Sequence, residues 1–366
     1  MRRCIFHYPG EIEDNPKVGS SVRPKMMLAA FRQMGYDVDE VTGNGKERKK
    51  KIGMIKKNID SGIKYDFIYS ESRNVPTLLT EESHVPLYPL MDFRFFNICR
   101  KKNIKIGLFY RDMHWKFDLF KESVALHKRM ILVPMFKYDL KKYKKLVDVL
   151  YIPTNLLERY LPNGFILKEL PPGGNLHEDI LKEKEGKKYN IDKLKIFYVG
   201  GVDGLYDMRT LFQAVKKNEK VSLIVCTPKE QWEKAKENYR SLLCNRIKVV
   251  HKKNNELDSY YKWADVVSVC FEKNKYTELA TPIKAFEAIS YGVPIIASKN
   301  TAISKKIKEE NIGWVIDYSL DTMSVLFNDL ISDYDDVKEK TTTIIKKAVE
   351  NTWNKRAEQV IRELTM

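Results

Sequence analysis

The sequence predicts an α/β protein with two doubly wound domains that face a cleft. Short runs of β-branched and aromatic residues, such as RCIFHY (3–8) and LKIFYV (194–199), alternate with amphipathic stretches, which is typical of parallel strands joined by helices. The pattern stops at a glycine- and charge-rich segment, residues 171–193, and then starts again, as expected at a domain boundary. A chain of 366 residues with 43% hydrophobic residues can bury two cores.

The first domain is expected to span residues 1–185 and to be Rossmann-like. Its predicted strands are apolar runs of parallel-sheet character at residues 3–8, 65–70, 104–110 and 147–152. Its predicted helices include one from about Lys25 to Met34, which ends at Gly35, and one within residues 93–103. This order gives a strand, a long loop and a helix at the start of the chain.

The second Rossmann-like domain is expected to span residues 186–350. Its predicted strands are residues 194–199, 221–226, 246–250, 265–270, 293–297 and 313–316. The last segment, residues 351–366, has Trp353 and an apolar stripe formed by Ala357, Val360, Ile361 and Leu364. We therefore expect a C-terminal helix that returns to the first domain, the alternative being a helix that packs only on the second.

Composition limits the environment and the partners of the chain. No stretch reaches the ~18 apolar residues of a membrane span and the N-terminus does not read as a secretory segment, so we expect a cytoplasmic protein. Five cysteines without metal-ligand spacing are interpreted as reduced thiols. The net charge of +16 indicates an acidic partner, which could be nucleic acid, anionic lipid or a phosphorylated substrate. Since no nucleic-acid-binding signature is present, nucleic acid is not expected.

The segment TPIKAFEAISYGVPIIA (281–297) combines a helix start, two opposite charges and a helix stop. Thr281 is predicted to cap the helix, Pro282 to occupy its first position and Gly292 to follow its last turn. Lys284 then lies in the first turn, where a cation opposes the helix dipole unless an anion is bound beside it. Glu287 lies on the same face, so the pair predicts a phosphate-binding site or, alternatively, an exposed ion pair.

Glycines follow the first strand of the second domain. Gly200 and Gly201 allow close backbone approach, so the loop is a candidate anion cradle or, alternatively, a plain turn. The loop lacks the GxGxxG pattern and the next strand ends without an acidic residue, which argues against an enzyme that uses a nicotinamide cofactor. No cluster at metal-ligand spacing is found in the sequence either, and no metal is expected.

Charged and aromatic residues follow a predicted strand of the first domain, in the sequence YRDMHW (110–115). Asp112 and His114 are the catalytic candidates, because a carboxylate or an imidazole at a strand end can move a proton. Their alternatives are a helix cap or ion-pair partner for Asp112 and a structural role for His114. Candidate acceptor contacts are Arg111 and the loop residues Gly19, Ser20, Arg23 and Glu71, which could equally be solvated.

The sequence resembles glycosyltransferase family four, the retaining, nucleotide-sugar-dependent enzymes of GT-B fold. The resemblance is carried by TPIKAFEAISYGVPIIAS, by the glycine loop, and by YRDMHW with the upstream VGSSVRP, which resemble a capsule and exopolysaccharide subgroup. It implies that Lys284 binds the donor diphosphate and Glu287 the ribose, with Thr281, Pro282, Gly200 and Gly201 beside them. It further implies a nucleoside-diphosphate sugar as donor substrate, no cofactor, and a lipid-linked glycan acceptor in cell-surface polysaccharide synthesis.

Two positions depart from the family pattern. Many members have a second Glu eight residues before the ribose-binding one, where this chain has Leu279, with Glu278 one place away. Many also have a basic residue soon after the glycine loop, for which Arg209 is the nearest candidate. The alternative function is therefore a non-catalytic relative that binds nucleotide sugar as a partner subunit.

Two basic segments predict contact with an anionic membrane surface. Seven cations crowd residues 46–57, and seven more surround the apolar run MILVPMF (130–136). Such a run resembles an interfacial anchor whose lysines meet lipid phosphates. We expect a peripheral protein at the inner face of the membrane, the alternative being a solvated basic face and an internal apolar run.

Overall fold

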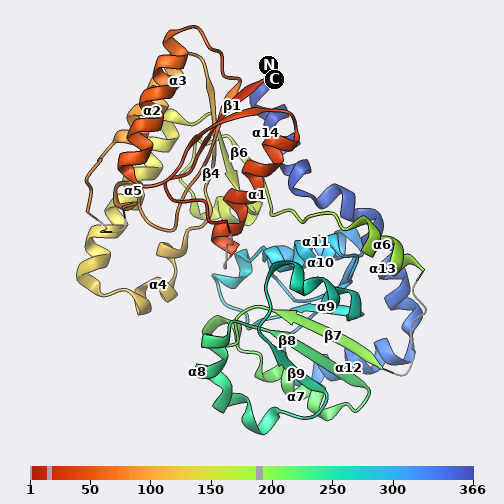
Figure 1. Ribbon diagram of the computed structural model, residues 1–366. Coiled ribbons are helices and arrows are strands. Elements are labelled where there is room, and N and C mark those ends of the chain that lie inside the picture. The colour runs from red at the N-terminus through yellow and green to blue at the C-terminus, as the bar shows by residue number, and fades with distance from the viewer. Residues whose placement is uncertain (1, 15–18, 82, 84, 187–192) are drawn as a thin grey trace. The chain divides into compact units, whose positions relative to one another are not determined.

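The computed structural model describes residues 2–14, 19–81, 83, 85–186 and 193–366. The chain forms two compact units (Figure 1). Unit 1 comprises residues 1–171 and 353–366, and unit 2 comprises residues 172–352. Each unit holds a six-stranded parallel sheet with helices around it, so the predicted α/β class with two Rossmann-like domains is confirmed.

The sheet of unit 1 has the strand order β2-β1-β3-β4-β5-β6. Its strands are β1 (Arg3–His7), β2 (Asp37–Val41), β3 (Phe67–Glu71), β4 (Lys105–Phe109), β5 (Val149–Ile152) and β6 (Leu167–Glu169). The four predicted strands are present, whereas β2 and β6 were missed. Both are edge strands and half-buried, so their sequences, DVDEV and LKE, lack the continuous apolar run that marks a central strand.

Helices α1 to α5 and the C-terminal helix belong to unit 1. Their bounds are α1 (Gly19–Gln33), α2 (Gly45–Asp60), α3 (Met91–Lys101), α4 (Asp118–Ser123), α5 (Leu126–Leu146) and α14 (Trp353–Thr365). Helix α1 begins six residues before the expected Lys25 and contains Pro24. Helix α14 packs against α1, β3 and β4, and Leu364 lies so close to Gly107 that a Cβ there would come within 2.8 Å of it.

The sheet of unit 2 has the order β12-β11-β10-β7-β8-β9 and contains the six predicted strands. These are β7 (Leu194–Val199), β8 (Val221–Cys226), β9 (Ile247–Val250), β10 (Val266–Val269), β11 (Ile295–Ser298) and β12 (Gly313–Ile316). The helices are α6 (Glu178–Glu185), α7 (Arg209–Lys217), α8 (Lys229–Tyr239), α9 (Asp258–Trp263), α10 (Ile283–Ser290), α11 (Ala302–Glu310), α12 (Leu320–Ser332) and α13 (Tyr334–Ala348). Buried clusters cover both faces of the sheet.

The division between the units lies at residue 171, not at residue 185 as expected. The charged segment after residue 177 suggested a linker, but its first half forms α6, which buries Ile180 and Leu181 in the core of unit 2. Lys184 is also buried, and its ammonium donates to the carbonyl of Ala264 at 2.6 Å. The segment is therefore part of the second domain.

Each sheet has one point at which the strand order reverses, and ligands of open α/β sheets bind beside the carboxyl ends of the strands there. In unit 1 the point lies between β1 and β3, and in unit 2 between β7 and β10. The loops that follow these four strands, taken with the first two turns of the helices after them, contain most of the predicted site residues. Among the described residues, no helix is long and apolar enough to cross a membrane, and all five cysteines are free thiols.

Candidate functional site

Helix α10 follows the switch-point strand β10 and begins at Ile283, one residue later than expected. Pro282, not Thr281, occupies the N-cap position, and it provides no side-chain cap. The expected cap by Thr281 is therefore wrong, and first-turn amides lack the acceptor that a capping side chain would supply. Gly292 has φ +65°, which confirms the predicted left-handed residue after the helix.

Lys284 and Glu287 form a close ion pair at the start of α10. The Lys284 ammonium donates to both carboxylate oxygens of Glu287, at 2.9 and 2.8 Å. Their side chains are 35% and 23% exposed, so a ligand can reach both charges. Partly exposed pairs of this kind contribute about 0–1 kcal/mol to stability. The pair is therefore a better candidate for binding a ligand than for stabilising the fold.

A stack of three rings holds Glu287 in place, and sequence reasoning missed it. The buried hydroxyl of Tyr261 donates to Glu287 Oε2 at 3.0 Å. The Tyr261 ring stacks on Tyr291 with centroids 4.1 Å apart, and Tyr291 stacks on His177 at 3.8 Å. The Tyr291 hydroxyl in turn donates to Asp258 at 2.6 Å. The aromatic pair in DSYYKW (258–263) is visible in the sequence, but its contact with α10 depends on packing between elements far apart in the chain.

The glycine loop after β7 is only partly available as an anion cradle. The amide of Gly200 donates to the carbonyl of Cys226 at 3.0 Å, so this amide is already engaged. The carbonyl of Gly201 accepts from the Tyr198 hydroxyl at 2.6 Å. A Cβ on Gly200 would come within 2.7 Å of that same hydroxyl, which explains why the turn requires glycine there.

Arg209 is the first residue of α7 and is more than half exposed. Its Nε donates to both oxygens of Asp207, at 3.0 and 2.8 Å, and Asp207 holds a pKa below its ordinary value because of this hydrogen bond. A diphosphate would have to compete with Asp207 for the guanidinium. In the structure the partner of Arg209 is therefore Asp207.

In unit 1 the structure brings Arg23, Glu71 and Arg111 together. Glu71 is completely buried, with Arg23 Nε 3.5 Å from one carboxylate oxygen and Arg111 Nη2 3.3 Å from the other. The Arg23 guanidinium also lies over the Phe109 ring, 3.5 Å from its centroid. Glu71 was expected to contact an acceptor, but its burial makes it a residue that positions the two arginines instead. Burial raises the pKa of Glu71, although both arginines act against that rise.

Asp112 and His114 are neighbours on the loop after β4, with Oδ1 of Asp112 3.9 Å from Nδ1 of His114. Their side chains are 16% and 21% exposed. The imidazole lies edge-on against Phe120 and Phe136, and burial lowers its pKa while Asp112 acts in the opposite direction. The neutral imidazole is therefore the main form at neutral pH, which suits a hydrogen-bond partner or base.

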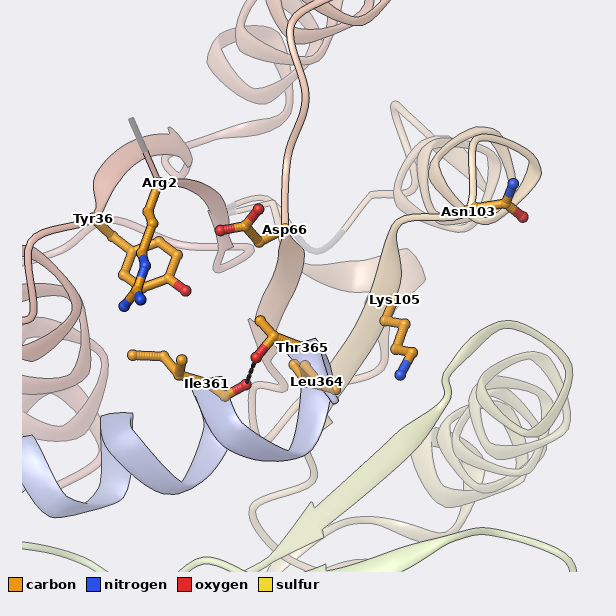
Figure 2. A pocket seen from close by; sticks show the side chains of 8 residues that line it. All are labelled: Arg2, Tyr36, Asp66, Asn103, Lys105, Ile361, Leu364 and Thr365. Atoms are coloured by element: carbon orange, nitrogen blue, oxygen red, sulfur yellow. Dashed lines mark hydrogen bonds between the residues drawn. The ribbon is translucent and has the colours of Figure 1, made fainter.

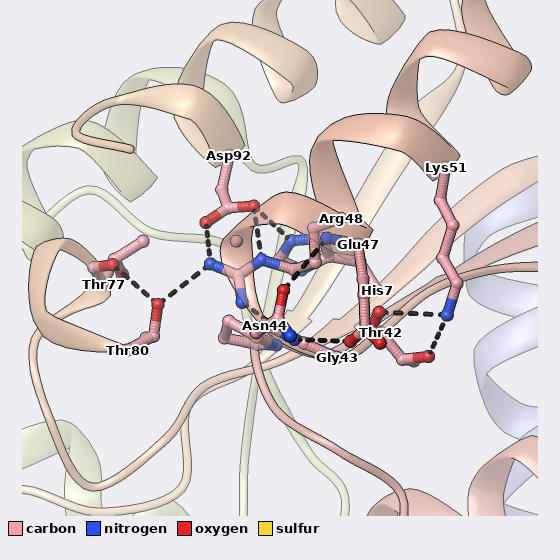
Figure 3. Close-up of polar contacts among 12 residues, drawn as sticks. His7, Thr42, Gly43, Asn44, Glu47, Arg48, Lys51, Thr77, Thr80 and Asp92 are labelled. Atoms are coloured by element: carbon pink, nitrogen blue, oxygen red, sulfur yellow. Dashed lines mark hydrogen bonds and ion pairs between the residues drawn. The ribbon is translucent and has the colours of Figure 1, made fainter. Parts of the chain in front are cut away.

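A buried polar network lies beneath this edge of the unit 1 sheet (Figure 3). His7, at the end of β1, contacts Ser70 through Nδ1 at 2.8 Å and Asp92 through Nε2 at 3.0 Å. Arg48 donates to Asp92 at 3.3 Å and to Thr80 at 3.0 Å. Burial raises the pKa of Asp92, but His7 and Arg48 outweigh burial and hold that pKa below its ordinary value. Arg48 also donates to the carbonyl of Gly43, so the network ties the end of β1 to the loops after β2 and β3.

The remaining candidates are not placed in a site. Gly19 and Ser20 begin α1, but their burial and contacts are outside what the structure describes. A pocket of about 440 Å³ lies at the opposite, amino-terminal ends of the unit 1 strands (Figure 2). It is lined by residues such as Arg2, Lys105 and Leu364 and by none of the predicted site residues.

Comparison with known proteins gives a family match for the second half of the chain and fold matches for the whole of it. Residues 179–350 match the family model described as glycosyl transferases group 1. No curated protein matches the sequence. Among solved structures, sucrose-phosphate synthase from Thermosynechococcus elongatus has 13% identity and a TM-score of 0.63, with 100% of this chain and 99% of that chain covered. HepE from Anabaena in complex with UDP has 11% identity and a TM-score of 0.64, with both chains covered completely.

A third similar structure is the α,α-trehalose 6-phosphate synthase from Burkholderia multivorans. It has 13% identity and a TM-score of 0.59, and the match covers 100% of this chain and 98% of that chain. Identities this low establish a shared fold and nothing finer. The chain thus has the two-domain fold of GT-B glycosyltransferases, and its residues 179–350 match the family model of glycosyl transferases group 1.

Proposed function

We propose that the protein is a glycosyltransferase that moves a hexosyl group from a nucleoside-diphosphate sugar to a lipid-linked glycan acceptor in cell-surface polysaccharide synthesis, such as capsule or exopolysaccharide. The Lys284–Glu287 pair carries this proposal, because it presents a cation and a carboxylate at the start of α10, beside the switch point of unit 2. The match of residues 179–350 to glycosyl transferases group 1 supports it. So does the UDP bound to HepE, a protein of the same fold.

The proposed roles of Lys284 and Glu287 follow from the charge that develops during sugar transfer. Breaking the bond between sugar and phosphate builds negative charge on the departing diphosphate, and a fixed ammonium with helix amides stabilises that charge most in the transition state. Lys284 would bind the diphosphate, and Glu287, held by Tyr261, would accept hydrogen bonds from the ribose hydroxyls. Because Lys284 supplies the positive charge, we propose a metal-independent reaction, and from the family resemblance we propose that it retains the anomeric configuration.

A donor panel tests the proposal. UDP, GDP, dTDP and CMP sugars are added to the purified protein, and unfolding temperature and release of nucleotide are measured with and without EDTA. The matching donor at 100 times its Kd stabilises the native state by about 2.7 kcal/mol, and EDTA leaves the rate unchanged. If no donor shifts the unfolding temperature or is turned over, the protein is not a nucleotide-sugar transferase.

The alternative, a non-catalytic partner subunit, is favoured by Leu279. This side chain stands at the position where many members of family four have a second carboxylate, and it is buried, with 8% exposure. Glu278 lies beside it, 3.7 Å from Lys273. In the donor panel, a subunit of this kind would be stabilised by a sugar nucleotide but would neither hydrolyse nor transfer it.

We further propose that unit 1 binds an anionic membrane surface, which would place the protein at the inner face of the membrane. The run MILVPMF lies in α5, and apolar side chains in the first two turns of this helix are open to solvent: Leu126, Met130 and Ile131 are 64%, 70% and 58% exposed. Exposed lysines accompany them, including Lys128, Lys137 and Lys141. In the other basic segment, residues 46–57, Arg48 cannot contact a membrane surface, because it is buried against Asp92.

Vesicle binding tests this surface. Binding to vesicles that contain anionic lipid is expected to be strong at low salt and to fall steeply as salt is added, since each cation near the surface contributes about 1 kcal/mol. The double variant Met130→Asp/Ile131→Asp should lose binding. Val325→Asp, which changes an equally exposed apolar residue of unit 2, should not. Equal binding to neutral and anionic vesicles would contradict the electrostatic part of the proposal.

A further inference from the structure

We propose that Glu287 is a built-in substitute for the donor phosphate, which occupies Lys284 while the site holds no ligand. Lys284 is released to a ligand that brings both a diphosphate and a ribose, whose hydroxyls bind Glu287 in exchange. The inference rests on the function proposed above and adds a reason why the site selects nucleoside diphosphates over free phosphate and pyrophosphate. The residues that carry it lie on α10 and on elements of unit 2 that pack against it.

Glu287 is the fixed member of the ion pair. Its Oε2 accepts from the hydroxyl of Tyr261 at 3.0 Å. Tyr261 is 0% exposed, so its hydroxyl cannot turn to water if Glu287 moves away, and a buried donor without an acceptor is costly. The Tyr261 ring is itself held, because it stacks on Tyr291 at 4.1 Å and meets Phe197 edge-on at 5.1 Å. The carboxylate therefore keeps its place when its other partner leaves.

Lys284 is the mobile member of the pair. Its side chain is 35% exposed and carries the ammonium on a flexible stem. Among the described residues, both hydrogen bonds of this ammonium go to Glu287, at 2.9 and 2.8 Å. Replacing the carboxylate by a phosphate exchanges one set of charge-assisted hydrogen bonds for another. The ammonium can therefore turn to an anion beside the first turn of α10, where the helix dipole also favours negative charge.

The exchange frees the acceptors that a ribose requires. Oε1 of Glu287 accepts from Lys284, and Oε2 accepts from both Lys284 and Tyr261. When the ammonium leaves, Oε1 loses its donor, while Oε2 keeps the bond from Tyr261 and has a lone pair free. The two oxygens can then accept from two neighbouring hydroxyls. A ligand without those hydroxyls leaves the carboxylate beside a phosphate of like charge, so it binds more weakly.

Calorimetry with inorganic pyrophosphate tests the hold of Glu287 on Lys284. Glu287→Gln keeps the shape of the side chain and removes its charge. Pyrophosphate should bind this variant about threefold or more tightly than the wild-type protein, because no carboxylate competes for Lys284 or repels the anion. Glu350→Gln removes the carboxylate of an ion pair with the same i,i+3 spacing and should leave the affinity unchanged. The double variant Lys284→Ala/Glu287→Gln should lose the gain.

Two nucleotides test the part played by the ribose. UDP should bind the wild-type protein about tenfold more tightly than its dideoxy form, which lacks both ribose hydroxyls, because hydrogen bonds to a charged carboxylate are lost. Glu287→Gln should reduce this difference. Tyr261→Phe keeps the ring stack and removes the hydroxyl that holds Glu287. It should weaken UDP by about threefold or more and leave the affinity for the dideoxy form unchanged.

The outcomes separate this inference from the proposed function. The inference is overturned if pyrophosphate binds the wild-type protein and Glu287→Gln equally, or if UDP and its dideoxy form bind the wild-type protein equally. In both cases the binding of UDP still supports the proposed function. If no nucleotide binds but Glu287→Gln gains affinity for pyrophosphate, the proposed function and the exchange with ribose both fail, whereas the hold of Glu287 on Lys284 stands.

Discussion

Lys284→Ala is expected to lower turnover by about 10²–10³-fold, the range found when one group that stabilises developing negative charge is removed. Affinity for the nucleoside diphosphate should fall about tenfold or more, because hydrogen bonds to charged groups contribute about 1.5–3 kcal/mol. The fold should remain, since the side chain is partly exposed and its pair with Glu287 contributes little to stability. Calorimetry with UDP, steady-state kinetics and the unfolding temperature measure the three effects.

A matched control is Lys347→Ala. Lys347 forms an ion pair with Glu350 at the same i,i+3 spacing, at 3.1 Å, and its side chain is 36% exposed, against 35% for Lys284. Both variants should therefore have similar unfolding temperatures, while only Lys284→Ala loses donor affinity. Unchanged affinity for the diphosphate in Lys284→Ala would show that the helix start does not bind the donor.

The parts of the fold that could be predicted are those in which local pattern and burial agree. Strand β7 was predicted with its observed bounds because LKIFYV is apolar except for Lys195 and lies in the middle of its sheet. Strand β2 was missed because DVDEV lies at a sheet edge, where four of its five residues are partly exposed to solvent. The boundary at residue 185 was wrong for a related reason: charged residues suggested a linker, but Ile180 and Leu181 decide where α6 packs.

In the candidate site, the sequence predicted which residues carry charge, but not the contacts that these residues make with distant parts of the chain. Lys284 and Glu287 are three residues apart on one helix, so their contact follows from helix geometry alone. The contact of Tyr261 with Glu287 joins residues 26 positions apart and depends on how α9 packs against α10. Likewise, Arg23 and Glu71 meet only because β1 and β3 are neighbours in the sheet, an order that no local pattern encodes.

Asp112→Asn tests the predicted catalytic candidates of unit 1. The amide keeps the shape of the side chain and removes its charge, so transfer should fall by about 10²-fold or more if the carboxylate moves a proton or positions a reacting hydroxyl. Donor affinity should be unchanged, because the donor-binding candidates Lys284 and Glu287 belong to unit 2. A loss of kcat with constant affinity for UDP would therefore place Asp112 on the acceptor side of the reaction.

The charge of Asp112 also leads to an effect on His114 that a purely structural role would not produce. Burial lowers the pKa of His114, and the negative charge of Asp112 raises it. Removing that charge takes away the opposing influence, so the pKa of His114 should fall further in Asp112→Asn, as an NMR titration of the imidazole protons would show. Asp118→Asn, a matched change of an exposed aspartate on the following helix, should alter neither transfer nor this titration. Transfer close to wild type in Asp112→Asn, with a lowered pKa of His114, would mean that the carboxylate tunes its neighbour without taking part in the reaction.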